Sequence, residues 1–205
     1  MAPSALNERQ FKEYWCIESE APDYQVRFLG DTCEILAPKG LTLWRKEKLQ
    51  QGMTVEYDAR VMDDRLSDMN CFWLASDPKT GNIWARADWR SGIFPRCYSL
   101  QMYYLGYGGN HNTTTRFRRY NGEEAGIEDK SRRPAILKEY TDTAHLLKSD
   151  HWYHVKIESS PNGRTRFYID GECIVDYADP IPLKCGWFGF RTTLSRTRIT
   201  NFKMY

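Results

Sequence analysis

Short runs rich in β-branched and aromatic residues recur along the whole chain, and Gly, Pro, Asn and Asp separate them. No window of about 12 residues carries the apolar stripe of an amphipathic helix. The best candidates for a helical turn are Glu8–Tyr14 and Ala144–Leu147. Many short strands in 205 residues favour two packed antiparallel sheets. We therefore expect an all-β sandwich or jelly roll that spans residues 1–205 as a single domain. The expected strands are Tyr24–Leu29, Thr32–Leu36, Leu41–Trp44, Thr54–Val61, Cys71–Ser76, Tyr98–Leu105, Thr114–Tyr120, Trp152–Glu158, Arg164–Ile169, Cys173–Tyr177, Trp187–Arg191 and Thr197–Tyr205.

The charge balance excludes a strongly polyanionic partner. The chain has 29 Lys and Arg against 27 Asp and Glu, a formal net charge of +2, so we expect no nucleic-acid partner. No apolar run approaches the ~18 residues of a membrane span, and we expect no membrane partner. Without an apolar leader the sequence as written predicts a cytoplasmic protein, whereas a removed signal segment would make it extracellular or periplasmic. The sequence leaves localisation and oligomeric state open.

The cysteines and histidines lack metal-ligand spacing. The six cysteines include no CxxC pair and none lies beside a histidine in a ligand-like motif. We therefore expect no metal and no cofactor, and mostly free, buried thiols. The cysteines are Cys16, Cys33, Cys71, Cys97, Cys173 and Cys185.

Residues 84–120 differ from the rest of the chain in composition. They contain nine aromatic residues, six arginines, no lysine and a single acid, Asp88, so the local charge is 6 − 1 = +5. A guanidinium offers a planar fork that fits a carboxylate, sulfate or phosphate, and neighbouring aromatic rings offer faces for stacking. The segment therefore predicts a groove for an anionic ligand with ring faces. A solvated basic strand with core aromatics is the alternative.

A glycine-rich reversal inside this segment predicts a hairpin. Arg116 and Arg118 are two residues apart and share one face of their strand. The reversal brings them near Tyr103 or Tyr104 and leaves His111 at the turn. We expect Tyr103, His111, Arg116 and Arg118 to line one concave pocket, together with Asn70 from another strand.

A tyrosine, a histidine and an arginine around one point fit β-elimination on a uronic acid. Arg116 would neutralise the carboxylate and acidify the α-proton. His111 or Tyr103 would remove that proton, and Tyr103 would protonate the leaving oxygen. We therefore assign catalytic roles to His111, Tyr103 and Arg116.

A second set of residues is expected to bind the substrate. Asn70 enters an otherwise apolar strand, where a buried amide needs a hydrogen-bond partner and could orient a substrate carboxylate. A local turn cap is the alternative for Asn70. The loop 77–92 is too long and aromatic for a simple connector, and it predicts a lid or rim over the groove. The expected substrate-binding residues are Asn70, Trp73, Arg86, Arg90, Tyr104, Asn112 and Arg118.

Several stretches resemble an uncharacterised family of concanavalin-A-like lectin/glucanase domains, found among polysaccharide-degradation genes. They are Asp68–Pro78, Tyr103–Asn110, Asn112–Tyr120 and Gly186–Thr192. The resemblance implies a jelly roll and a carbohydrate-related role. More distantly, the chain is similar to jelly-roll polysaccharide lyases, which use Tyr and His with a group that neutralises the carboxylate. The Glu-x-Asp-x-x-Glu pattern of related glucanases is absent, which disfavours a retaining glycosidase.

Three functions follow from these observations. The first is a lyase that cleaves an acidic, uronate-containing saccharide by β-elimination. The alternatives are a non-catalytic carbohydrate-binding module and a small-molecule enzyme of a biosynthetic pathway that uses the same groove. All three predict an anionic saccharide or another small carboxylate as the ligand.

Overall fold

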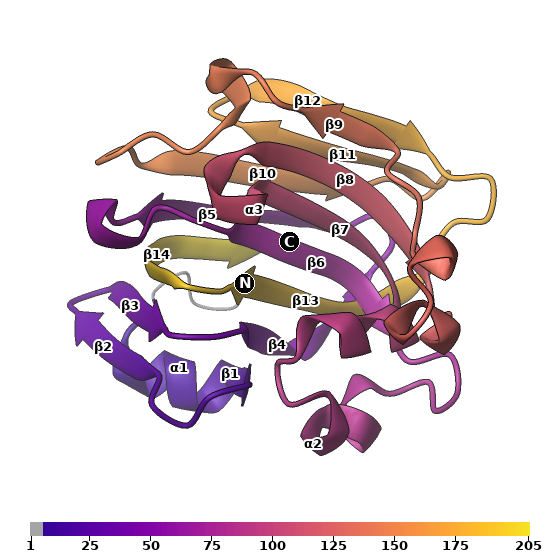
Figure 1. The fold of residues 1–205 in the computed structure, drawn as a ribbon, viewed down its shortest axis with the longest axis horizontal. Helices are drawn as coiled ribbons and strands as arrows, with labels where there is room; N and C mark the ends of the chain where they lie inside the picture. Colours follow the sequence, from indigo (N-terminus) through magenta and orange to yellow (C-terminus); the bar gives the residue numbers. More distant parts are fainter. Residues whose placement is uncertain (1–5) are drawn as a thin grey trace.

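A computed structural model describes residues 6–205, and it confirms the all-β expectation. Two antiparallel sheets of seven strands each form a β-sandwich (Figure 1). In spatial order, sheet A holds β1 (Trp15–Ser19), β4 (Leu41–Gln50), β13 (Cys185–Thr192), β6 (Met69–Ser76), β7 (Gln101–Gly108), β8 (Thr114–Asn121) and β9 (Lys138–Tyr140). Sheet B holds β12 (Glu172–Ala178), β11 (Arg164–Ile169), β10 (Tyr153–Ser159), β5 (Thr54–Val61), β14 (Ser195–Met204), β3 (Thr32–Ala37) and β2 (Gln25–Leu29).

Helical elements are short and lie in the connections. The 3-10 turns are η1 (Asp63–Arg65), η2 (Ile83–Arg86), η3 (Phe94–Ser99), η4 (Glu124–Ile127), η5 (Lys130–Arg132) and η6 (Thr143–His145). The α-helical elements are α1 (Glu8–Tyr14), α2 (Ala87–Arg90) and α3 (Gly109–Asn112). The expected helix at Glu8–Tyr14 is present, and the side chain of Asn7 caps it by accepting a hydrogen bond from the Gln10 amide at 3.1 Å.

All twelve expected strands are present; Thr54–Val61 and Arg164–Ile169 have the expected bounds, and the other ten differ at one or both ends. The strand expected to begin at Tyr98 begins at Gln101, because η3 occupies Phe94–Ser99. Two strands were not expected, β1 and β9. The helical turn expected at Ala144–Leu147 is the 3-10 turn η6.

The main core lies between the two sheets. Along β5 the burial alternates with a period of two, as expected for a strand with one face in the core. Aromatic rings pack in the middle, where the ring centroid of Trp73 lies 5.6 Å from that of Tyr103 and 6.0 Å from that of Phe167. The Trp73 indole also donates a hydrogen bond across the sandwich to Thr165 Oγ1 at 2.9 Å. Trp73 is thus a core residue and not the ligand-binding residue that the sequence predicted.

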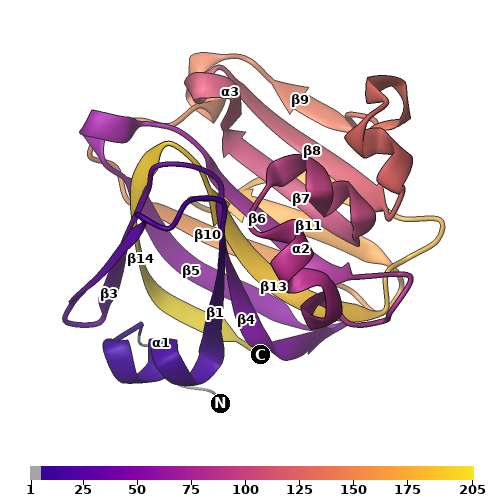
Figure 2. The ribbon, with the colours of Figure 1, turned by 60° about the horizontal axis from the view of Figure 1, so that its bottom comes forward.

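A second apolar layer covers part of the outer face of sheet A. Residues 77–100, which include α2, fold over this face, as Figure 2 shows in front of β6–β8. Every residue of β6 is therefore buried, which explains why Cys71–Ser76 shows no polar face in the sequence. The buried members of this layer are Trp44, Phe72, Ala75, Ile83, Cys97, Tyr98, Leu100, Met102, Tyr104, Tyr120 and Trp187.

The six cysteines are free thiols in the structure. Burial raises the pKa of Cys33 and Cys71 to about 12 and that of Cys97 to about 11, so these three are poor nucleophiles. Within residues 6–205, no group of three or more His, Cys, Asp or Glu side chains is arranged to hold a metal ion. No helix in the same range is long and apolar enough to cross a membrane.

Candidate functional site

Pairing across sheet A builds a polar row on its outer face. Arg191 of β13 lies opposite Asn70 of β6, Asn70 opposite Gly106 of β7, and Gly106 opposite Arg116 of β8. Residues in register share a face, so four strands distant in sequence place these residues side by side. The neighbouring row, two residues along, brings Tyr104 opposite Arg118.

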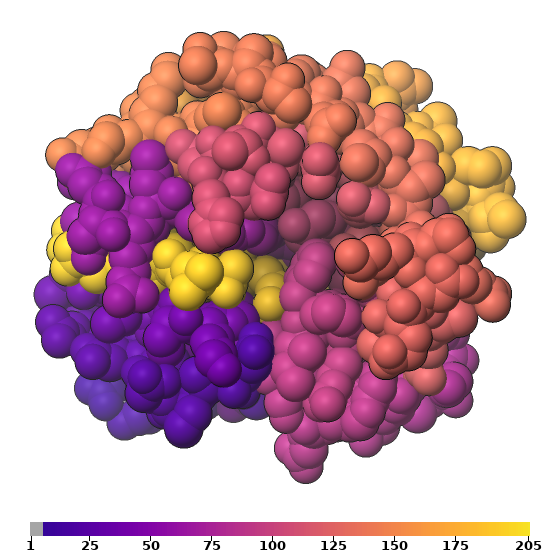
Figure 3. All heavy atoms as spheres, in the orientation of Figure 1, coloured from indigo at the N-terminus to yellow at the C-terminus, as the bar shows by residue number. Residues whose placement is uncertain are grey.

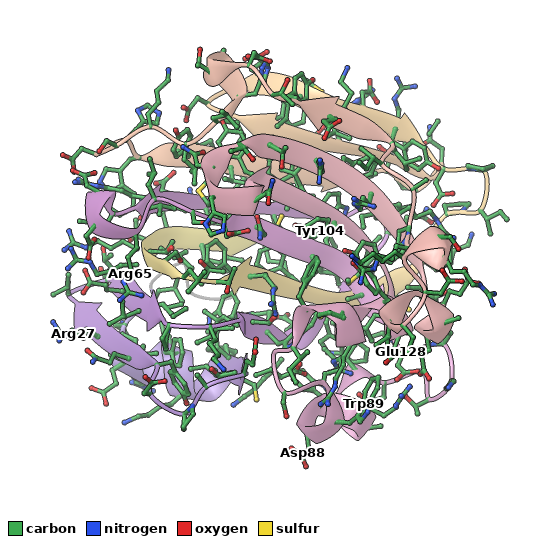
Figure 4. The ribbon with its side chains drawn as sticks, viewed as in Figure 1. Arg27, Arg65, Asp88, Trp89, Tyr104 and Glu128 are labelled. Carbon is green, nitrogen blue, oxygen red and sulfur yellow. The ribbon has the colours of Figure 1, made fainter. Side chains whose placement is uncertain are left out.

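A pocket of about 580 Å³ opens over these two rows. The space-filling view shows the face hollowed at its centre, between the segment near α2 and the β7–β8 turn (Figure 3). Figure 4 places Tyr104 in this central region. The charged and amide residues of the lining are Glu20, Asp68, Asn70, Asn110, Arg116, Arg118 and Arg191. The aromatic lining consists of Phe94, Tyr98, Tyr104 and Tyr120.

Gly106 forms part of the pocket floor because it has no side chain. A Cβ atom at this position would overlap the Tyr104 hydroxyl and would lie 3.3 Å from Asn70 Oδ1. The Tyr104 hydroxyl therefore packs directly over Gly106, with the Asn70 amide oxygen beside it. Any larger residue at 106 would displace the Tyr104 phenol.

The three arginines of the pocket differ in their partners. Arg116 Nε donates to Glu139 Oε1 of β9 at 2.5 Å, so its charge is matched. Arg118 donates to the Pro134 carbonyl. Arg191 donates to Thr42 Oγ1 at 3.2 Å and to the Gly92 carbonyl at 2.7 Å. Among the described residues, neither Arg118 nor Arg191 has a carboxylate within 4.0 Å.

Tyr104 is a proton donor in this setting. Burial raises the pKa of its phenol well above the usual value, and the nearby Asp68 carboxylate raises it further. Arg191 and Arg118 oppose this shift without reversing it. The Tyr104 hydroxyl is therefore protonated at neutral pH.

The structure corrects the prediction for Tyr103. Its side chain is 1% exposed and faces the inter-sheet core, where its hydroxyl donates to Asp179 Oδ2 at 2.6 Å. Because side chains alternate along β7, Tyr104 faces the pocket and Tyr103 cannot. The expectation that Tyr103 lines the pocket is wrong.

The predicted turn residues also lie outside the pocket lining. His111 is exposed in α3, with a left-handed backbone at φ 57°, and is not among the lining residues. The Asn112 amide bonds the backbone of Leu147 twice, donating to its carbonyl at 2.9 Å and accepting from its amide at 2.8 Å. Asn112 thus fixes the connection before β10. The expected grouping of His111 with Arg116 and Asn70 is wrong.

The two arginines of the expected rim have structural partners. Arg86 pairs with Glu124 and stacks on Trp89, with its guanidinium 4.2 Å from the ring centroid. Arg90 is fully buried and pairs with Glu18. Neither lines the pocket, and no residue of the expected rim 77–92 does; the pocket is bordered instead by the residues that follow it, Ile93, Phe94 and Pro95.

Of the predicted residues, Asn70, Tyr104, Arg116 and Arg118 meet in the pocket. Sequence reasoning missed Arg191, Asp68 and Glu20. The only local signal for Arg191 was its place in the run Gly186–Thr192, and its pairing with β6 is set by nonlocal register.

Comparisons with solved structures show the same fold. A protein of unknown function with a galectin-like fold from Bacillus subtilis superposes with a TM-score of 0.75 at 18% identity, covering 100% of this chain and 97% of that one. The metal-free carbohydrate recognition domain of Emp46p gives a TM-score of 0.65 at 11% identity, with 100% and 94% coverage. The carbohydrate binding module CBM66 from Bacillus subtilis gives 0.61 at 12% identity, with 93% and 94% coverage.

No curated protein matches the sequence. A family model described as a domain of unknown function, DUF6250, matches residues 35–202, which is most of the chain. The resemblance to an uncharacterised family is thereby made specific: the chain belongs to the DUF6250 family.

Proposed function

We propose that the pocket on the outer face of sheet A binds an acidic saccharide. The observation that carries this proposal is the half-buried Arg118, which has no carboxylate within 4.0 Å among the described residues, while the buried Arg191 lines the same pocket. A guanidinium in this situation gains most from an incoming carboxylate or sulfate. The rings of Phe94, Tyr98 and Tyr104 supply faces against which a sugar ring can pack.

The fold comparisons are consistent with this proposal. Two of the similar structures are a carbohydrate binding module and a carbohydrate recognition domain. Because a shared fold does not fix function, the pocket chemistry has to carry the argument. That chemistry favours binding over catalysis, since the expected Tyr103–His111 pair is not in the pocket and Tyr104 holds its proton.

The test is calorimetric titration of the full chain with uronate oligosaccharides and with neutral oligosaccharides of the same length. We expect the uronates to bind at least about tenfold more tightly, because a charged hydrogen bond contributes about 1.5–3 kcal/mol. Affinity should also fall as salt is added. Equal affinity for neutral and acidic sugars, or no binding of either, would contradict the proposal.

Cleavage by β-elimination is a second candidate, favoured by the Tyr104 phenol lying between Asn70 and Arg118. In that reaction Tyr104 would act as a phenolate and take the α-proton, the bond from the β-carbon to the leaving oxygen would break, and the leaving oxygen would receive this proton from the Tyr104 phenol. The raised pKa of Tyr104 works against the first step at neutral pH. Incubating the same oligosaccharides with the protein and following the ultraviolet absorbance of the unsaturated product separates cleavage from binding alone.

Tyr103 and Tyr104 provide a matched pair of variants. Tyr104→Phe should weaken uronate binding by about 2- to 12-fold, the equivalent of about 0.5–1.5 kcal/mol, with little change in stability. Tyr103→Phe should lower the free energy of unfolding by about 1–3 kcal/mol, because Asp179 loses a buried donor. Titration and chemical denaturation measure the two effects. If Tyr103→Phe is the variant that loses uronate affinity, the assignment of Tyr104 to the pocket face and of Tyr103 to the core face is wrong.

A further inference from the structure

Asn70 presents an unsatisfied oxygen at the floor of the pocket. Its side chain is 3% exposed, and its Oδ1 atom has no hydrogen-bond partner among the described residues. A buried acceptor without a donor costs free energy, so native proteins rarely keep one without a reason. The adjacent Arg191 does not supply the donor, because its hydrogen bonds go to Thr42 and Gly92.

The orientation of the Asn70 amide is imposed by Asp68. Asn70 Nδ2 donates to Asp68 Oδ1 at 2.9 Å. The other carboxylate oxygen of Asp68 accepts a hydrogen bond from the Ser67 hydroxyl. An ionised carboxylate only accepts hydrogen bonds, so the reversed amide would place two acceptors against each other. Oδ1 must therefore point away from Asp68.

Oδ1 lies beside the Tyr104 hydroxyl, which packs over Gly106. It lies 3.3 Å from the point where a Cβ of residue 106 would stand, and the Tyr104 hydroxyl overlaps that point. Oδ1 is shielded from water in the unliganded protein. A ligand hydroxyl that displaced the Tyr104 phenol from this position would meet Oδ1.

We propose that Asn70 Oδ1 selects a ring hydroxyl of the saccharide by accepting its hydrogen bond. Asp68 is the positioning residue, because it holds Nδ2 of the Asn70 amide and so leaves Oδ1 to face the ligand. The inference rests on the proposed function and deepens it. It also changes the sequence-based hypothesis for Asn70, since an amide that neutralises a carboxylate has to donate. The carboxylate is left to Arg118 and Arg191, and recognition requires an acidic sugar that also carries a hydroxyl within reach of Asn70.

The experiment compares two probes on two proteins. D-glucuronate and D-galacturonate carry a carboxylate and ring hydroxyls, whereas oxane-2-carboxylate has the same ring and carboxylate without hydroxyls. In the wild-type protein we expect a uronate to bind at least about tenfold more tightly than oxane-2-carboxylate. In Asn70→Leu this ratio should fall to within about threefold of unity, through loss of uronate affinity alone.

The outcomes separate the two proposals. If no acidic probe binds the wild-type protein, the proposed function fails and this inference fails with it. If the uronate binds but its preference over oxane-2-carboxylate is the same in Asn70→Leu, only the inference about Asn70 is overturned.

A measurement without ligand tests the role of Asp68. In the wild-type protein the Asn70 side-chain amide should give an NMR signal shifted and protected from exchange by its bond to Asp68. In Asp68→Asn that signal should move, and the preference for uronate should fall, because an amide at 68 no longer forces the orientation of Asn70. An unchanged signal and preference would show that Asp68 does not position Asn70. Circular dichroism checks that both variants are folded.

Discussion

Replacing Arg90 with alanine is expected to lower the free energy of unfolding by about 3–5 kcal/mol, because the change leaves a buried carboxylate without its partner. Arg90 is 0% exposed and Glu18 only 5%. The guanidinium binds the Glu18 carboxylate through both Nε, at 3.3 Å, and Nη2, and it also donates to the Ile83 carbonyl at 2.5 Å. These contacts fix the segment around α2 to β1, at the side of the pocket.

The pH dependence of this variant has a definite sign. Burial raises the pKa of Glu18, and the Arg90 charge opposes that rise. Without Arg90 the pKa of folded Glu18 rises further above its unfolded value. A carboxyl group whose pKa is higher in the folded than in the unfolded protein lowers the free energy of unfolding as the pH rises from the unfolded pKa to the folded pKa. The difference in the free energy of unfolding between Arg90→Ala and the wild type should therefore be largest at neutral pH. It should shrink when the pH falls below the usual carboxyl pKa.

Denaturant titrations of matched variants measure this effect. The double variant Glu18→Leu with Arg90→Met removes both charges and should recover much of the lost stability. Uronate affinity per folded molecule should change little in either variant, since Arg90 does not line the pocket. If Arg90→Ala instead kept its stability and lost affinity, Arg90 would belong to the binding site, as the sequence first predicted.

The strands were predictable because their signal is local. Alternation along β5 and β10, and the Asp170-Gly171 turn between β11 and β12, are properties of neighbouring residues. β9 has no such signal. Its three residues, Lys138–Tyr140, form a strand only because the edge of β8 offers them hydrogen bonds. The sequence therefore predicts the sandwich and both edge strands of sheet B, but it misses the edge strands of sheet A, β1 and β9.

The site was only half predictable for a related reason. Alternation correctly separates Arg116, Arg118 and Tyr120 from Phe117 and Arg119. It does not say which set faces the core, because each set contains an arginine and an aromatic residue, and sheet A is buried on both faces over much of its area. The choice of Tyr103 over Tyr104 was therefore arbitrary.

Replacing Arg118 with alanine is expected to weaken uronate binding by about 1.5–3 kcal/mol, roughly 10- to 150-fold, with the fold intact. Arg118 lines the pocket opposite Tyr104, and its guanidinium donates a hydrogen bond to the Pro134 carbonyl. Its charge is thus available to a ligand carboxylate. Arg116, which the sequence equally favoured, is the weaker anchor because Glu139 already offsets its charge.

Arg119 is the matched control, because it is the next residue of β8 and points to the opposite face. Its Nε donates to Asp179 Oδ2 at 2.6 Å, and its Nη2 donates to the Ile181 carbonyl at 2.7 Å. Arg119→Ala removes the same charge from the same strand, so it should reduce stability and leave uronate affinity within about twofold of wild type. Titrations of both variants at low and high salt distinguish a local contact from a general loss of positive charge. Equal losses of affinity in the two variants would mean that the saccharide senses only the overall charge of β8, and Arg118 would then have no specific contact with the carboxylate.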